Sequence, residues 1–281
     1  MTTLNQEFNN EFDILYNNIA SNQAPGLDIY EKSVFLTNAQ EEVVLSIYSN
    51  TEASNLETYE RTEEMRRYLD SLIETKEISF EYGYYVENTD IFYTDKEHTD
   101  EIVPSNGHYY IDKPTRRQYI WIEEGDDPSY YHYELQIPIS SESYITSLPE
   151  DLWFITYEAV QLVPSDNICL SKKELDVVPV TQDAFHNIKN NPFRGAANNR
   201  VLRLDFKENK VELISKNDIG TYKVRYIKKL KPIILDSLGN SLSIDGEHNE
   251  SECTLNRTLH KIIINRAVRL AIASMAQSIQ Q

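Results

Sequence analysis

The chain has 281 residues, 40% hydrophobic and 26% charged, so it can form one large or two modest globular domains and is not a disordered polypeptide. Its 45 acidic and 27 basic residues give a net charge of −18, which argues against binding nucleic acid through a broad basic surface. The two cysteines, Cys169 and Cys253, are too few for a disulfide framework and fit a reducing compartment.

Charge and hydropathy are uneven along the chain. Residues 1–110 hold 22 acidic and 6 basic residues, whereas residues 111–281 hold 23 and 21, so the acidity is concentrated in the N-terminal part. This is either a surface that keeps the protein soluble or an acidic wall with a function. The N-terminus has no basic segment followed by an apolar run, and no long uncharged apolar stretch occurs, so we expect neither secretion nor a membrane span.

Three helices are predicted at the start of the chain. Apolar residues at steps of three and four predict the first, with Thr3 and Gln6 placed as a capping box. Asp28 and Glu31 repeat the capping pattern for a second helix, whose apolar surface is wider than one stripe and should pack against more than one neighbour. A third and much more polar helix is predicted over residues 56–73.

Two β regions follow the helices. Residues 76–176 contain short β-branched and aromatic runs separated by turn signals, and their tyrosines either alternate across a half-exposed sheet or form a contact surface. Residues 177–245 predict a hairpin around residues 207–209 and then a long strand over residues 221–235. Pro232 should end the pairing of that strand or place it at a sheet edge.

A last helix is predicted over residues 254–281, which carry apolar residues at helical steps, four basic residues and no acid. The leading helices are acidic and the last one is basic. We therefore infer an α+β fold in which the helices of residues 1–75 and the C-terminal helix form a four-helix bundle, and the β regions are a large insertion.

No dense catalytic signature is present. Phosphate-binding, zinc-protease, nucleophile-elbow and paired C-x-x-C motifs are absent and there are only 8 glycines, so we expect no enzyme, no cofactor and no metal site. The acidic, histidine-containing stretch 94–101 is interpreted as a solvated loop and not as a metal site. The acids of residues 123–127 lie together in a turn beside Trp121, and not across a cleft as a glycosidase pair would.

Basic residues gather on the predicted strand over residues 221–235. Lys223, Arg225, Lys229 and Lys231 can share one face of it. Either they form a charged strand edge that discourages aggregation, or they dock onto an acidic neighbour such as the N-terminal helices of another copy.

Five stretches carry a family resemblance: EFNNEFDILYNNI (7–19), APGLDIYEKSVFLTNAQEEVV (24–44), VPVTQDAFHNIKNNPFRG (178–195), YKVRYIKKLKPIIL (222–235) and LHKIIINRAVRLAIASM (259–275). Together they resemble a structural protein of crAss-like tailed bacteriophages, a head–tail connector (adaptor or ring) subunit. The resemblance covers both chain ends and residues 177–235 well, and the middle, about 76–170, only in general texture.

The resemblance implies a dodecameric ring below the portal vertex, in contact with the portal protein and neighbouring connector or tail proteins. DNA would pass through its ejection channel without specific binding. It also implies a virion location after assembly in the host cytoplasm, with no catalysis and no membrane. The alternatives are a tail-tube or tail-hub component, a host-glycan binding module using Trp121 and Trp153, and, weakest, a hydrolase.

The expected site residues are contacts between subunits or partners. They are Tyr30, Phe35, Val44 and Tyr48 on the outer side of the second helix, Arg266 and Arg269 on the last helix, and Lys228, Lys229 and Lys231 on the strand edge. The two arginines should pair with acids of a neighbouring bundle. Exposed ion pairs contribute only about 0–1 kcal/mol each, so they should set orientation, while apolar burial at roughly 25 cal/mol per Å² supplies adhesion.

Overall fold

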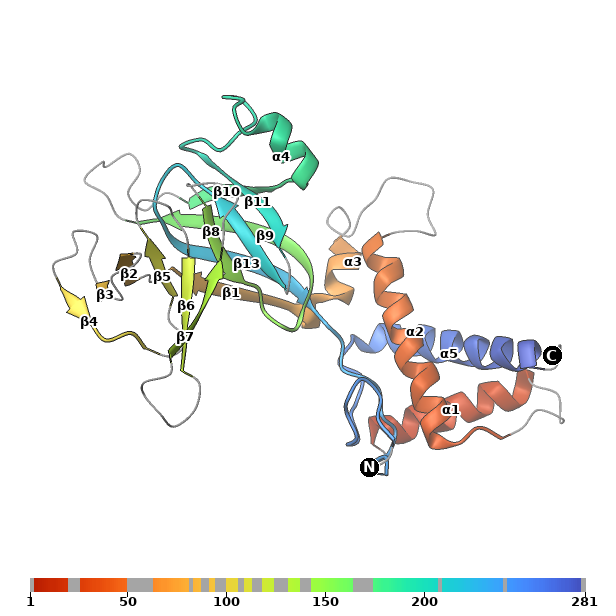
Figure 1. The fold of residues 1–281 in the computed structure, drawn as a ribbon. Coiled ribbons are helices and arrows are strands. Elements are labelled where there is room, and N and C mark those ends of the chain that lie inside the picture. The colour runs from red at the N-terminus through yellow and green to blue at the C-terminus, as the bar shows by residue number, and fades with distance from the viewer. Residues whose placement is uncertain are drawn as a thin grey trace. The chain divides into compact units, whose positions relative to one another are not determined.

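The computed structural model describes residues 3–19, 26–49, 63–80, 83–86, 91–93, 100–105, 109–112, 118–123, 131–136, 143–163, 174–206, 209–239 and 242–278. The chain divides into two compact units. Both chain ends, residues 1–73 and 227–281, make the first unit, and residues 74–226 make the second. Figure 1 shows the helices and strands of each unit, most of them labelled.

The first unit is helical and joins the two ends of the chain. Its helices are α1 (Leu4–Ile19), α2 (Ile29–Ser49), α3 (Glu63–Tyr68) and α5 (Arg257–Ser278), with a short 3-10 turn η1 at Asp70–Leu72. Helix α5 contacts both α1 and α2 (Figure 1). Buried Phe8 of α1 lies edge-on to His260 of α5, with ring centroids 5.0 Å apart, and the Tyr16 hydroxyl is 2.8 Å from the Met275 sulfur.

Both predicted capping boxes are confirmed. The Thr3 backbone N–H donates to the Gln6 side chain at 3.2 Å, and the Gln6 N–H donates to the Thr3 hydroxyl at 3.3 Å. The Asp28 N–H donates to Glu31 at 3.0 Å, and the Glu31 N–H donates to Asp28 at 2.7 Å. Each box satisfies two backbone donors at a helix start, which is why α1 and α2 begin where the sequence predicts.

The predicted third helix is wrong at its C-terminal end. Helix α3 stops at Tyr68, and Ile73 already begins strand β1. Leu69, which precedes the 3-10 turn, and Leu72, its last residue, are both fully buried, so the apolar residues of this segment anchor the passage from α3 to β1. Residues 56–62 of the predicted helix lie outside the described residues, and the four-helix bundle stays a prediction.

The second unit is built on a seven-stranded sheet with the strand order β1-β13-β9-β10-β11-β12-β8. These strands are β1 (Ile73–Ser79), β8 (Ser143–Ser147), β9 (Leu152–Leu162), β10 (Glu174–Pro179), β11 (Arg200–Phe206), β12 (Lys210–Ile214) and β13 (Ile219–Lys228). The sheet draws on both predicted β regions, 76–176 and 177–245. It is curled, because Phe80 beside the first strand lies edge-on to Tyr144 in the last, with ring centroids 5.9 Å apart.

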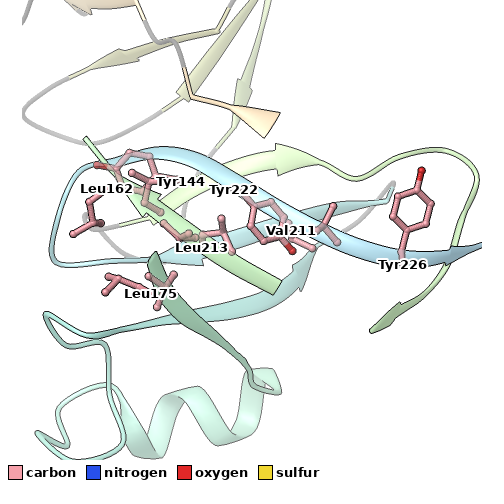
Figure 2. Packing of buried hydrophobic residues seen from close by; sticks show 11 residues of the cluster. Tyr144, Leu162, Leu175, Val211, Leu213, Tyr222 and Tyr226 are labelled. Atoms are coloured by element: carbon pink, nitrogen blue, oxygen red, sulfur yellow. The ribbon is translucent and has the colours of Figure 1, made fainter. Parts of the chain in front are cut away.

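Each face of this sheet has its own core. Figure 2 shows one of them, in which Tyr144, Leu162, Leu213 and Tyr222 pack together. On the other face, Leu202 and Leu204 of β11 pack with Phe185 of the short helix α4 (Gln182–Ile188). Successive side chains of a strand point to opposite faces, so β11 serves both cores.

Helix α4 was not predicted from the sequence, whereas the β11–β12 hairpin that follows it was. Thr181 caps α4 by accepting a hydrogen bond from the Ala184 N–H at 3.3 Å, a signal that the sequence contains. The helix links β10 to β11, which pair in parallel and so need a crossover. Strands β11 and β12 pair antiparallel, and Asn209 adopts the left-handed conformation (φ 57°) where β12 begins, as a tight hairpin requires.

A separate six-stranded sheet in this unit has the order β4-β3-β2-β5-β6-β7. Its strands are β2 (Gly83–Val86), β3 (Ile91–Tyr93), β4 (Glu101–Ile102), β5 (Tyr109–Asp112), β6 (Gln118–Glu123) and β7 (Tyr131–Gln136). Phe92, Tyr110, Tyr119 and Trp121 form a buried aromatic cluster, in which the Phe92 ring lies edge-on to Trp121 at 5.1 Å. Tyr110 and Tyr119 therefore supply core and not contact surface.

The predicted strand over residues 221–235 is too long, and of the two outcomes expected from Pro232, an end to pairing or a position at a sheet edge, the edge position is wrong. Strand β13 ends at Lys228, and it lies between β1 and β9, so it is not an edge strand. Lys223 lies 3.7 Å from Glu77 of β1, and the Arg225 guanidinium donates to Thr75 at 3.2 Å. These basic side chains are neighbours of β1 and do not protect a free edge.

A buried polar cluster lies within the seven-stranded sheet. The Tyr222 hydroxyl donates to Glu158 Oε2 at 2.7 Å, and Arg203 Nε lies 3.5 Å from the same oxygen. Burial raises the pKa of Glu158, while the Tyr222 hydrogen bond and the Arg203 charge oppose that rise. The three groups come from β13, β9 and β11, and Tyr222 and Arg203 both approach the Glu158 carboxylate, so we interpret them as a structural tie between strands.

Replacing Tyr222 by Phe should destabilise the second unit by about 1–3 kcal/mol, because it leaves a buried carboxylate without its hydroxyl donor. The free energy of unfolding from urea denaturation, followed by tyrosine and tryptophan fluorescence, measures this. The control is Tyr157→Phe on β9, where the side chain is exposed and the loss should be near zero. Equal stability of the two variants would contradict the role given to the cluster.

Candidate assembly surface

Helix α2 carries polar residues on a face that points into the helical unit. Ser33, Thr37 and Gln40 follow one another at steps of four and three, so they share one side of the helix, and all three are buried. Buried polar side chains need hydrogen-bond partners. The stripe therefore marks a place where α2 meets other polar groups.

The partner of this stripe is the backbone of residues 231–235, the segment that follows β13. Four hydrogen bonds join them. The segment donates Leu235 N–H to Ser33 Oγ and Ile233 N–H to Thr37 Oγ1, both at 3.1 Å. The helix donates the Thr37 hydroxyl to the Ile233 carbonyl at 3.4 Å and Gln40 Nε2 to the Lys231 carbonyl at 2.6 Å. Pro232 has no N–H and needs no donor partner. On its other side, Ile234 exchanges backbone hydrogen bonds with Ser251 at 3.0 and 3.1 Å. The backbone N–H and C=O groups of this segment thus find hydrogen-bond partners although the segment belongs to no sheet.

Helix α1 is fixed to this segment and to α2 by further polar contacts. Buried Asn5 donates to the Ile234 carbonyl at 3.1 Å and to Glu250 at 2.9 Å. Lys32 of α2 forms an ion pair with Asp13 of α1 at 2.8 Å. The inner faces of α1 and α2 are therefore occupied within one chain, and only their outer faces can meet a partner.

The structure places the four predicted contact residues of α2 differently from one another. Tyr30, Phe35 and Tyr48 are half-buried, so each keeps some exposed surface. Val44 is 0% exposed, and its prediction as an outer contact is wrong. The reason is that α2 is covered on more than one side, with α5 packed against it.

The basic residues of α5 are exposed, as predicted, but one already has an acidic partner in its own chain. Arg266 Nε lies 2.6 Å from Glu42 Oε2 of α2, with side chains 43% and 39% exposed. Arg269 is exposed one turn further along the helix. An exposed pair of this kind contributes about 0–1 kcal/mol, so it orients α5 against α2 more than it holds it.

The three predicted docking lysines do not lie on a strand edge. Lys228 is the half-buried last residue of the interior strand β13, and Lys229 and Lys231 are exposed beyond it. The Lys231 carbonyl accepts the bond from Gln40, so its backbone is fixed while its side chain is exposed. Any docking by these lysines would use a loop surface and not β-pairing.

An apolar groove between α1 and α5 was not predicted. Its volume is about 290 Å³, and it is lined by Glu11, Ile14, Leu15, Lys261 and Asn265. Ile14 is 61% exposed, and Ile262, beside Lys261 on α5, is 53% exposed. The available signal was that Ile14 lies off the stripe through Phe8 and Phe12, on the otherwise polar side of α1.

The described residues were expected to hold neither a metal site nor an open saccharide-binding surface, and three observations bear on this. They contain no group of three or more His, Cys, Asp or Glu side chains that could hold a metal ion. Trp121 is buried, and Trp153 is half-buried and stacked with Phe154, so neither is an open saccharide platform. Residues 94–99 and 124–127, from the two acidic stretches, lie outside the described residues. Among the helices that are described, none combines the length and apolarity that a membrane crossing needs.

Replacing Thr37 by Val should destabilise the helical unit by about 1–3 kcal/mol, because the buried Ile233 N–H loses its acceptor at nearly constant side-chain volume. Thr37→Ser keeps the hydroxyl and is the matched control. It should retain most of the stability in thermal or urea unfolding. If Val and Ser behave alike, the hydrogen bond does not stabilise the docked segment.

Cys253 offers a probe of the same packing. Its thiol lies 3.7 Å from Gln40 Oε1, and burial raises its pKa to about 11, so little reactive thiolate exists near neutral pH. In a Cys169→Ser background, maleimide labelling at pH 7.5 should be at least about tenfold slower in native protein than in urea. Gln40→Ala should speed native labelling, as followed by mass spectrometry. Fast labelling of the unmodified helical unit would contradict this packing.

Comparison with known proteins places the chain in a family. A sequence model of the family "Phage tail ring protein 3/4" matches residues 1–91 and 130–281. Ring protein 3 of Bacteroides phage crAss001 is 38% identical over 273 residues, covering 97% of this chain and 96% of that protein. Ring protein 4/5 of the same phage is 29% identical over 282 residues, covering 98% and 94%. The chain therefore belongs to the ring protein family of crAss-like phages and is a structural component of the virion.

Proposed function

We propose that this chain is a non-enzymatic subunit of a homo-oligomeric ring in the connector between the phage head and tail, around the channel through which DNA is ejected. The observation that carries the proposal is family membership that includes both chain ends, the parts that form the helical unit. The two relatives are named as ring proteins, and a ring subunit acts by binding its copies and its neighbours.

The distribution of charge supports assembly through two different surfaces. Residues 1–31, which include α1, have no basic residue, and residues 253–281, which include α5, have no acidic residue. A ring in which each copy contacts the next by unlike surfaces needs such complementarity. The groove between α1 and α5 adds exposed apolar area, which supplies adhesion.

The net charge of −18 supports a channel that DNA passes without being held. An acidic wall repels the phosphate backbone, and specific binding would need basic groups to neutralise phosphates. The remaining parts of the proposal are a dodecameric ring seated below the portal vertex, contacts with the portal protein and neighbouring connector or tail proteins, and assembly in the host cytoplasm. These rest on the family resemblance.

A tail-tube or tail-hub position is the second candidate. It is favoured by the family's description, which names a tail ring protein. A host-glycan binding module is disfavoured, because Trp121 is buried.

A reconstruction of the phage particle that resolves the rings near the portal distinguishes these positions. We expect density for this chain in a closed ring between portal and tail, with one copy per portal subunit. Purified chain mixed with portal protein should give, by native mass spectrometry, complexes that contain several copies of the 32.7 kDa chain. A chain that stays monomeric with the portal protein and is absent from particles would refute the proposal, and density inside the tail tube would favour the second candidate.

A further inference from the structure

A tight turn after α4 holds a phenylalanine almost fully in solvent. Phe193 is 84% exposed, and it follows Pro192 in the segment that leads to β11. A single exposed apolar residue is ordinary by itself. Here, however, the surrounding backbone is fixed and the neighbouring charges are of one sign, and both properties are typical of a docking element.

The turn is fixed by hydrogen bonds on both sides of Phe193. The Asn191 side chain accepts the N–H groups of Phe193 and Arg194 at 2.9 and 3.2 Å, and the Asn191 carbonyl accepts the Gly195 N–H at 2.7 Å. The Arg200 guanidinium donates to the Phe193 carbonyl at 2.5 Å. A Cβ atom at Gly195 would lie 2.8 Å from the Asn191 carbonyl oxygen, so the close turn requires glycine. An aromatic side chain on such a backbone loses little conformational entropy when it is buried by a partner.

The turn is also basic. Residues 184–202 contain Lys189, Arg194 and Arg200 and no acidic residue, in a chain whose net charge is −18. The element therefore presents an aromatic side chain next to a cation, Arg194, which is exposed. Its partner should combine an apolar recess with a carboxylate at the rim.

The α1/α5 groove has both properties. It is open and apolar, with Ile14 on its wall, and its volume of about 290 Å³ exceeds the roughly 150 Å³ that holds a benzene ring. Glu11 lines it, and Glu7 lies one turn away on the same exposed side of α1. Lys261 is a basic lining residue, on the α5 wall, so an incoming cation should approach from the α1 wall.

We propose that Phe193 of one copy inserts into the α1/α5 groove of a second copy, with Arg194 paired to Glu11 at the rim. The contact joins two unlike surfaces of the same chain and is therefore heterologous, the kind that closes into a ring. The inference rests on the proposed ring function and names the contact between its neighbouring subunits.

Cross-linking between differently labelled copies tests the contact directly. In the Cys169→Ser background, Phe193→Cys protein is mixed with Ile14→Cys protein and treated with a short bismaleimide, and covalent dimer is measured by gel and mass spectrometry. Phe193→Cys mixed with Val178→Cys, an exposed position on β10, is the matched control. We expect the 14–193 pair to give several-fold more dimer than the control. Equal yields would overturn the proposal.

Charge exchange gives a second measurement in protein that keeps its own cysteines. Arg194→Glu should weaken self-association or joint assembly with the portal protein several-fold, and Glu11→Arg in the same chain should restore it. Phe193→Ser should weaken assembly by about tenfold or more, without loss of folding because the side chain is exposed.

The outcomes separate this inference from the proposed function. If particles carry the ring but all three variants assemble normally, the contact is wrong and the function stands. If the chain is absent from particles while the 14–193 cross-link still forms, the proposed function is wrong and the contact stands. If Arg194→Glu blocks incorporation and Glu11→Arg never rescues it, the turn binds a different protein and the self-contact is refuted.

Discussion

The segment 231–235, which is buried from Pro232 to Leu235, imposes the constraint on which the helical unit depends. Its backbone leaves the sheet with β13, yet it is buried and must satisfy its polar groups. Three side chains of α2 and the backbone of Ser251 do this. This requirement explains why the inward face of α2 mixes apolar residues with Ser33, Thr37 and Gln40. It also fixes the chain that leads into α5, because Cys253 packs against Gln40.

Features with local causes could be read from the sequence, and features with distant causes could not. The capping boxes of α1 and α2, the β11–β12 hairpin and the apolar face of α5 each depend on residues a few positions apart. The segment after β13 is bound by α2, 196 residues away along the chain, through the Ile233 N–H and the Thr37 hydroxyl, and this contact could not be read from the sequence around the strand. Strand β13 is an interior strand because β1 and β9 pair on either side of it. The basic residues of the strand itself do not indicate these neighbours.

The predicted contact residues also divide into those with local and those with distant causes. Exposure of Arg266 and Arg269 followed from their place on α5, whereas Val44 is buried on α2, a helix that packs against α5 from the other end of the chain. The six-stranded sheet lies largely outside the family match.

The family model leaves residues 92–129 unmatched, and these supply β4, β5 and β6. That sheet has its own aromatic cluster around Phe92, so its sequence can vary while the two chain ends keep their packing.

The acidic residues of the leading helices and the basic residues of α5 serve both contacts within one chain and, in the proposed ring, contacts with a neighbour. Arg266 pairs with Glu42 and Lys32 pairs with Asp13, so part of the complementarity joins elements of one chain. Exposed charges remain, with Glu7 and Glu11 on α1 and Arg269 on α5. Exposed pairs are worth about 0–1 kcal/mol each, and salt screens them, so they can select the orientation of a neighbour but cannot hold it. A durable ring therefore needs apolar surface at the same place, which makes the groove beside Glu11 a more informative feature than the charge of −18.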